Sequence, residues 1–275
     1  MSVNNNVKKI TVPAIVQMKQ NREKISVLTA YDHLMARMLD DAGLDIILVG
    51  DSAGMVISGF ESTLPVTMDM MLYHVAAVRR GVRRALLVAD MPFLSFQAGI
   101  DTAVYNAGRF LQEAGAEAVK LEGGEAVAET VHKMVGYGIP VMGHLGLTPQ
   151  SVHKLGGYRL QARKSEDQER LLADAHTLAA AGCFSIVLEK VPAEVAKRVT
   201  AELPIPTIGI GAGPDCDGQV LVLHDMLGMF DTPPLKFVKQ YAQLAGEVRK
   251  AVAAYADDVR SGRFPGEEQT FHVDK

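Results

Sequence analysis

Eight short apolar runs, separated by longer stretches with helical spacing, restrict the fold of this chain more than any other feature of its sequence. Continuous apolar runs of this kind are typical of strands that are buried on both faces, as in a parallel sheet. The runs cover residues 25–30, 45–50, 85–90, 116–120, 140–144, 184–189, 205–210 and 219–223. Alternation of strand and helix predicts a parallel sheet with right-handed crossovers, and eight strands close a (βα)8 or TIM barrel.

The stretches between the runs place apolar side chains on one face of a helix. Helices are therefore expected at residues 31–42, 67–80, 101–114, 124–135, 166–181, 192–202 and 234–259. The last of these is opened by Pro233 and Pro234, because proline is favoured in the first turn of a helix. Residues 10–20 are expected to form a further helix that covers the bottom of the barrel.

The step from the seventh to the eighth run is the weak point of the barrel interpretation. Residues 210–220 are too few for a full helix with two loops, so a short or distorted helix is expected there. A doubly wound open sheet remains the alternative fold. No linker rich in proline or serine divides the chain, and residues 1–275 are therefore expected to form a single domain.

Composition and charge exclude several classes of function. The 28 Lys and Arg residues against 32 Asp and Glu give a net charge of −4, which provides no electrostatic footprint for nucleic acid or an anionic membrane. Two cysteines can build neither a disulfide framework nor a four-ligand zinc site. The first residues lack the apolar segment of a signal peptide and no apolar run could span a bilayer, so a cytoplasmic protein is expected.

Polar side chains stand at the ends of six of the eight runs, where each apolar strand is expected to finish. In a barrel, catalytic groups lie at the carboxyl ends of the strands. The candidates in chain order are Tyr31, Asp32, Asp51, Ser52, Asp90, Lys120, Glu122, His144 and Glu189. The positions therefore predict a single rim that carries ionisable and metal-binding groups.

Three carboxylates, Asp51, Asp90 and Glu122, would repel one another at this rim unless a cation lay among them. No cluster of histidine and cysteine accompanies them, which favours a hard, oxygen-binding ion over zinc. Mg2+ fits best, because it takes one or two carboxylates together with waters and substrate oxygens. The alternative for Asp51 and Asp90 is that each only caps the helix that follows it.

Lys120, Glu189 and His144 each leave more than one role open. Lys120 could be a Schiff-base nucleophile, an anchor for a substrate carboxylate, or an ion-pair partner of Glu122 or Asp90. Glu189 ends an apolar strand and suits general-base chemistry, and the alternative is a salt bridge to Lys190. His144 could be an acid, a hydrogen-bond donor or an ordinary core histidine.

Two motifs have the form of signatures for other chemistry. Residues 50–54 read GDSAG, the G-x-S-x-G form of a hydrolase nucleophile elbow. In that fold several strands come before the one that leads into the serine, whereas here only one expected strand, at 25–30, does so. Residues 209–213 read GIGAG, which lacks the dinucleotide spacing. These glycines could bind phosphate or could only let the backbone turn in a crowded place.

A series of longer motifs carries a family resemblance. In order they are LTAYD at 28–32, VGDSAG at 49–54, TLPVT at 63–67, DMPF at 90–93, VKLEGG at 119–124, GHLGLTPQ at 143–150, GGY at 156–158 and IGIGAG at 208–213. The set closely resembles the ketopantoate hydroxymethyltransferase family, from about residue 8 to FPGEE at 264–268. The resemblance implies a barrel of the phosphoenolpyruvate/pyruvate superfamily type and a homo-oligomer, often a decamer.

The family reaction transfers a hydroxymethyl group from 5,10-methylenetetrahydrofolate to 3-methyl-2-oxobutanoate, which gives 2-dehydropantoate and opens pantothenate biosynthesis. The resemblance implies one Mg2+ per subunit, bound by Asp51 and Asp90, with Glu122 completing the metal environment. It implies that Glu189 is the proton acceptor. The substrate-binding residues it implies are Asp51, Ser52, Asp90, Lys120 and His144.

This assignment is chemically coherent, because a 2-oxo acid can chelate Mg2+ and the ion then stabilises charge on the keto oxygen. Glu189 would remove the C3 proton and Lys120 would hold the acid, while Ser52 becomes a ligand-binding hydroxyl. The rivals are a Mg2+-dependent 2-oxo acid lyase of the same barrel superfamily and a serine hydrolase on Ser52. Folate contacts are apolar and diffuse, so the sequence does not identify the folate-binding residues, and Cys216 has no evident role.

Overall fold

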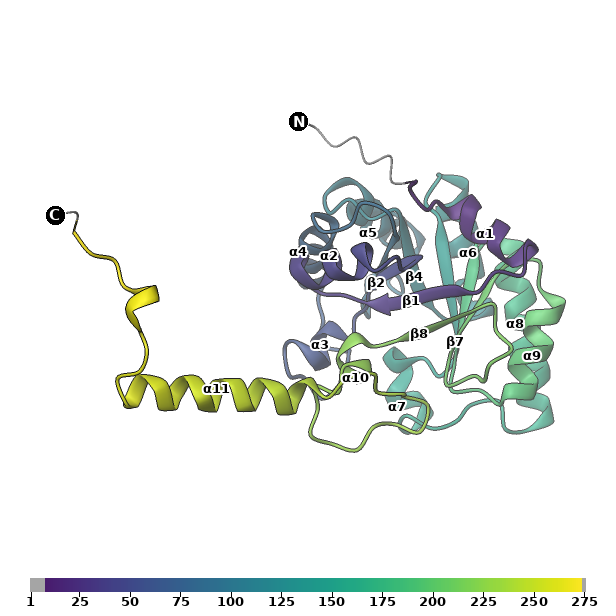
Figure 1. Ribbon diagram of the computed structural model, residues 1–275. Helices are drawn as coiled ribbons and strands as arrows, with labels where there is room; N and C mark the ends of the chain where they lie inside the picture. The colour runs from purple at the N-terminus through teal and green to yellow at the C-terminus, as the bar shows by residue number, and fades with distance from the viewer. Residues whose placement is uncertain (1–7, 274–275) are drawn as a thin grey trace. The chain divides into compact units, whose positions relative to one another are not determined.

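A closed parallel barrel forms the centre of the computed structural model, which describes residues 8–273. The strands follow one another around the barrel in chain order, and β8 pairs with β1 to close it (Figure 1). They are β1 (Ile25–Thr29), β2 (Ile46–Val49), β3 (Leu86–Asp90), β4 (Ala118–Glu122), β5 (Val141–Gly146), β6 (Ser185–Glu189), β7 (Thr207–Ile210) and β8 (Gly218–Leu221). The barrel prediction is confirmed, and the alternative of an open doubly wound sheet is wrong.

Helices connect most of the strands and surround the barrel (Figure 1). The longer ones around the barrel are α1 (Val12–Gln20), α2 (His33–Asp41), α4 (Met68–Arg79), α5 (Ile100–Gln112), α6 (Ala128–Gly136), α8 (Ser165–Ala181) and α9 (Ala193–Glu202). A further long helix, α11 (Leu244–Arg260), follows the barrel in the chain. Short turns of helix are α3 (Ala53–Val56), η1 (Glu125–Val127), η2 (Pro149–Ser151), α7 (Val152–Leu155), α10 (Leu223–Met226) and η3 (Glu267–Gln269). In the described part of the chain, no helix combines the length and apolar character needed to cross a membrane.

Two apolar cores hold the barrel together. The inner core fills the barrel with side chains from alternate strand positions, among them Ile46, Leu86 and Ile208. Ile15 of α1 is fully buried in the same cluster, so this helix packs against the inner core. The outer core lies between strands and helices, where Phe110 of α5 is fully buried. Burial on both faces explains why the strands read as continuous apolar runs.

The connection from β7 to β8 contains no helix, which corrects the expectation of a short one. Asp217 pins this loop, because its carboxylate accepts hydrogen bonds from Thr207 N at 2.9 Å and Lys19 Nζ at 2.7 Å. Cys216 is fully buried, and a Cβ built at Gly209 would lie 3.0 Å from its Sγ atom. The glycine of β7 therefore leaves room for Cys216, which gives this cysteine a packing role.

The contacts within the chain separate two compact units, Met1–Val222 and Leu223–Lys275. A single domain over residues 1–275 stays a prediction. In the second unit the long helix begins at Leu244 and not at residue 234, so the expected start was wrong. Backbone hydrogen bonds from Tyr241 N to Met226 O and from Leu244 N to Leu227 O, both within this unit, close residues 227–243 into a loop. Pro233 and Pro234 begin no helix because they lie inside that loop.

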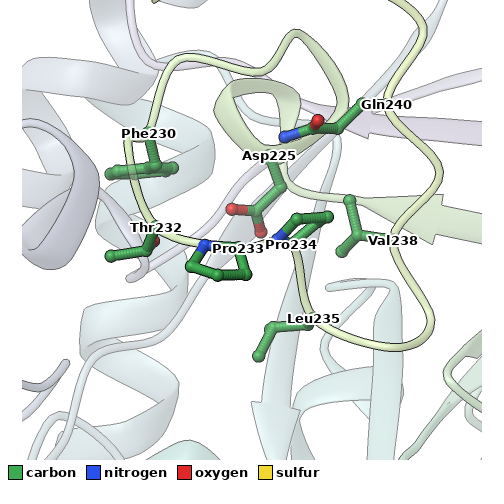
Figure 2. Close-up of a pocket in the computed structure, with 8 residues that line it drawn as sticks. All are labelled: Asp225, Phe230, Thr232, Pro233, Pro234, Leu235, Val238 and Gln240. Carbon is green, nitrogen blue, oxygen red and sulfur yellow. The ribbon is translucent and has the colours of Figure 1, made fainter.

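The loop of the second unit encloses a small pocket (Figure 2). The side chains that line it are Asp225, Phe230, Thr232, Pro233, Pro234, Leu235, Val238 and Gln240. Burial raises the pKa of Asp225, the carboxylate of this pocket.

The outer core gives a direct test of the packing. We expect Phe110→Ala to lower the free energy of unfolding by about 3–5 kcal/mol, because it leaves a cavity beneath α5. Tyr105→Ala, on the same helix but 69% exposed, should change stability by no more than about 0.5 kcal/mol. Denaturant titration of both variants measures the difference. Equal losses in the two variants would show that α5 does not pack as described.

Candidate active site

The strand ends bring the predicted polar residues together at one rim of the barrel. Register places Asp90 beside Lys120, and Glu122 beside His144. Glu189 ends β6, where it faces Gly146 of β5. The side chains that the structure brings to this rim are Asp51, Ser52, Asp90, Lys120, Glu122, His144 and Glu189. All are buried except Ser52 and Glu189, which are partly exposed.

Lys120 lies at the centre of the group. Its Nζ atom is 2.9 Å from Asp90 Oδ1 and 3.1 Å from His144 Nδ1. Burial alone would lower the pKa of this lysine, but Asp90, Glu122 and Asp51 outweigh burial and raise it. A Schiff-base lysine needs a lowered pKa to be nucleophilic. The ammonium therefore stays charged here, which favours an ion pair and an anchor for an anion over a nucleophile.

His144 connects Lys120 to Glu189. Burial and the charge of Lys120 lower the pKa of the imidazole, so the neutral form is favoured. Its Nδ1 atom accepts from Lys120 Nζ, which leaves the proton on Nε2, 3.4 Å from Glu189 Oε2. This arrangement favours His144 as a hydrogen-bond donor that faces Glu189 over an ordinary core histidine or an acid. The ammonium of Lys190, the residue considered as a salt-bridge partner of Glu189, contacts a backbone carbonyl: its Nζ atom donates to Tyr158 O at 2.6 Å.

The carboxylates crowd one another. Asp51 N donates to Asp90 Oδ2 at 3.3 Å, and burial together with Asp90 raises the pKa of Asp51 to about 7. Burial and Asp51 likewise raise the pKa of Glu122. Neither Asp51 nor Asp90 caps a helix, since α3 and α5 begin after Ser52 and Gly99 with no side-chain cap. The capping alternative is therefore wrong, and the repulsion is a property of the site.

Gln150 is a buried member of the site that sequence reasoning missed. Its backbone N–H donates to Glu122 Oε2 at 3.0 Å. Its side-chain Nε2 donates to Asp51 Oδ2 at 2.9 Å and to Met91 O at 2.8 Å. One residue thus holds carboxylates from β4 and from the end of β2. Its signal was only its place at the end of the GHLGLTPQ motif, because a neutral amide gives no charge pattern.

The hydroxyl of Ser52 forms its hydrogen bond with a tyrosine hydroxyl and not with a general base. Its Oγ atom lies 2.8 Å from the hydroxyl of Tyr31, a buried residue that follows β1. Among residues 8–273, no histidine forms a hydrogen bond with Ser52. A nucleophilic serine needs an adjacent general base, so the arrangement disfavours the serine hydrolase. Asp32, the neighbouring candidate, is exposed and caps α2 through Met35 N at 2.9 Å.

Comparison with known proteins identifies the family. The model of the family described as ketopantoate hydroxymethyltransferase matches residues 9–267. The chain belongs to this family. Relatives named 3-methyl-2-oxobutanoate hydroxymethyltransferase include one from Moorella thermoacetica, 57% identical over 96% of this chain and 98% of the relative. Another, from Pelobacter propionicus, is 55% identical over 96% and 98% of the two chains.

Solved structures of related folds support the barrel assignment. A 2,3-dimethylmalate lyase, described as a PEP mutase/isocitrate lyase superfamily member, superposes with a TM-score of 0.60 at 17% identity, over 94% of this chain and 91% of its own. A phosphonopyruvate hydrolase solved with oxalate and Mg2+ superposes with a TM-score of 0.59 at 14% identity, over 96% of this chain and 92% of its own. At these identities the likeness shows the fold alone, and the lyase alternative gains no support beyond fold.

The carboxylate oxygens at the rim are the donor atoms of the predicted Mg2+ site. Within residues 8–273, no three His, Cys, Asp or Glu side chains converge closely enough to hold a metal ion by themselves. Lys120 and Gln150 form contacts between the three carboxylates and separate them. Asp51 and Asp90 nevertheless lie beside each other, because Asp51 N donates to Asp90 Oδ2 while Asp90 Oδ1 contacts Lys120 Nζ. Because Mg2+ needs only one or two protein carboxylates, Asp51 and Asp90 fit it.

Gln150 offers a test that does not depend on turnover. Gln150→Leu removes the amide that orients Asp51, and we expect the affinity for Mg2+ to fall by about 10–100-fold, as for other groups that orient metal ligands. Gln17→Leu, at an exposed position of α1, is the matched control and should bind Mg2+ like the parent. Calorimetric titration measures both. Unchanged affinity in a folded Gln150→Leu variant would remove this role.

Proposed function

We propose that this protein transfers a hydroxymethyl group from 5,10-methylenetetrahydrofolate to 3-methyl-2-oxobutanoate, giving 2-dehydropantoate for pantothenate biosynthesis in the cytoplasm. One observation carries the proposal: a buried, charged lysine lies among three carboxylates and is linked through His144 to Glu189. The names of relatives more than 50% identical to the chain support the same reaction.

Binding of the 2-oxo acid follows from the charges of the rim. Lys120 presents an ammonium to the substrate carboxylate, and the partly exposed Ser52 offers a hydroxyl held by Tyr31. Asp51 and Asp90 would hold Mg2+, with Glu122 beside them. When bound, that ion supplies charge stabilisation at the keto oxygen. Asp51 and Glu122, whose pKa values are raised by burial and by neighbouring carboxylates, would repel their neighbours less with a cation bound there.

Glu189 acts as the general base. It removes the proton at C3 of the bound acid, and the electrons of that C–H bond move towards the keto group as the enolate forms. His144 keeps its Nε2 proton pointed at Glu189 and so fixes the orientation of the carboxylate. Water adds to the methylene carbon of the folate and the two C–N bonds of that carbon break, which releases tetrahydrofolate and a one-carbon unit at the oxidation level of formaldehyde. The C3 carbon attacks this carbon, and the electrons of its C=O bond move to the oxygen, which takes up a proton and becomes the hydroxyl of the product.

Proton exchange separates this reaction from its rivals. In D2O with Mg2+ and without folate, the enzyme should exchange the C3 proton of 3-methyl-2-oxobutanoate, because enolate formation needs no folate. Glu189→Gln should slow the exchange by about 10²–10⁴-fold, the usual contribution of a general base. A chelator should stop it reversibly. Proton NMR of the substrate methine follows the exchange directly.

Glu202→Gln, an exposed carboxyl change on α9, is the control and should exchange at the parent rate. Exchange that persists without Mg2+, or at full rate in Glu189→Gln, would contradict the proposed mechanism. Accumulation of tetrahydrofolate with product distinguishes transfer from a lyase, which would cleave a 2-oxo acid without consuming folate. Labelling of Ser52 by a fluorophosphonate would support the serine hydrolase.

The protein is further proposed to be a homo-oligomer, a decamer by analogy with the family. The support is helix α11, on which Val248, Val252, Tyr255 and Val259 are all between 45% and 60% exposed. Their spacing places them on one face of the helix. An exposed apolar stripe of this kind is typical of an interaction surface, and a second copy of the chain would cover it.

Light scattering tests the assembly. The parent should have a mass several times that of one chain, and Val252→Glu should shift it towards smaller species, because a charge is then placed in the apolar stripe. Lys250→Ala, on the opposite face of α11 by helical spacing, should leave the mass unchanged. A monomeric parent, or an unchanged assembly in Val252→Glu, would argue against this surface.

A further inference from the structure

The part of the chain from α6 to the start of α8 has an unusual charge pattern. From residue 130 to residue 165 the chain contains no Asp or Glu, although it carries a net charge of −4 overall. The same segment contains Lys133, Lys154, Arg159, Arg163 and Lys164. The last three are exposed and follow one another closely just before α8. Residues 159–164 are therefore a basic segment in an acidic protein.

This segment lies beside the proposed general base. Gln161 N donates to Lys190 O at 2.8 Å, and Lys190 Nζ donates to Tyr158 O at 2.6 Å. Lys190 directly follows Glu189, so the segment crosses the carboxyl end of β6. Burial and the charges of Asp51, Glu189 and Glu122 raise the pKa of Tyr158, whose backbone carbonyl accepts from the residue that follows Glu189. Along the chain, Arg159 follows Tyr158 directly, so the cations begin next to a residue that contacts the end of β6.

The cations of the segment have no carboxylate partner. Within residues 8–273, Arg159, Arg163 and Lys164 form no ion pair, whereas Asp167 and Glu169 of α8 pair with Arg170 and Arg198. Arg163 and Lys164 line a surface cavity together with residues 160–162 and Asp167. Asp167 is the one acid of this lining, and its charge is met by Arg170. The positive charge facing the cavity is thus uncompensated.

The small 2-oxo acid does not account for these cations. It has one carboxylate, which Lys120 matches inside the rim. Three further cations outside the rim suit a longer anion with several charges. A folate has this form, since an aromatic head is followed by a tail of one or more glutamyl carboxylates. The partly exposed Tyr158 and Leu160 provide apolar surface on the path between the rim and the cations.

We propose that Arg159, Arg163 and Lys164 bind the anionic glutamyl tail of the folate cosubstrate, so that the enzyme prefers folates with several glutamates. The proposal rests on the proposed function and adds to it the site and the form of the cosubstrate. The aromatic head lies towards Glu189, and the tail extends over the cavity before α8. Exposed ion pairs are individually weak, so the preference comes from several charges acting together.

The test compares 5,10-methylenetetrahydrofolate carrying one glutamate with the form carrying five. In the parent, the KM for the pentaglutamate should be about tenfold lower, since exposed ion pairs contribute about 0.2–1 kcal/mol each and 1.4 kcal/mol corresponds to tenfold. The triple variant R159Q/R163Q/K164Q should lose this difference while the monoglutamate KM changes far less. Raising the ionic strength should reduce the difference in the parent.

Lys133→Gln is the matched control, because it removes one exposed cation of the same acid-free segment from α6 and should keep the full preference. Circular dichroism checks that the triple variant is folded. Equal KM values for the two folates in the parent, or a preference that survives in the triple variant, would overturn the tail site while product formation leaves the proposed function standing. Product from neither folate, despite C3 exchange, would overturn both.

Discussion

A charged lysine is buried among three carboxylates at the carboxyl end of the barrel, and the chemistry of the rim is arranged around that pairing. Lys120 neutralises one negative charge, and burial penalises the charge that remains on Asp51 and Glu122. The negative charge that remains on Asp51 and Glu122 must be neutralised by protons or by a bound cation. Affinity for a divalent ion, and for an anionic substrate on the lysine side, thus follow from one imbalance of buried charge.

Neutral groups give this cluster its order. Gln150, through its backbone N–H and its side-chain amide, and His144, through its imidazole, each contact two charged partners without adding charge. Gln150 ties Asp51 to Glu122 across two strands, whereas His144 relates Lys120 to Glu189. Replacing either by an acid or a base would change the charge balance as well as the geometry. The site therefore separates two tasks, charge in one set of residues and orientation in another.

The barrel could be predicted from the sequence because its strands are buried on both faces, which leaves a continuous apolar record in the chain. The acidic residues of the site could be predicted because they stand at the ends of such apolar runs. Gln150 was not, since its contacts join positions far apart in the chain and its side chain is neutral. The start of α11 and the helix-free β7–β8 loop depend on long-range hydrogen bonds that local spacing does not encode.

Closure of the barrel has a consequence for how the chain folds. Each strand pairs with its neighbour in sequence, except that β8 must return to β1. The salt bridge of Lys19 to Asp217 spans nearly the same separation. Contacts this distant form slowly, because a long loop must be ordered before they stabilise it. During synthesis one edge of β1 stays unpaired until β8 has been made. An unpaired strand edge can pair with other chains, so aggregation is favoured during this interval.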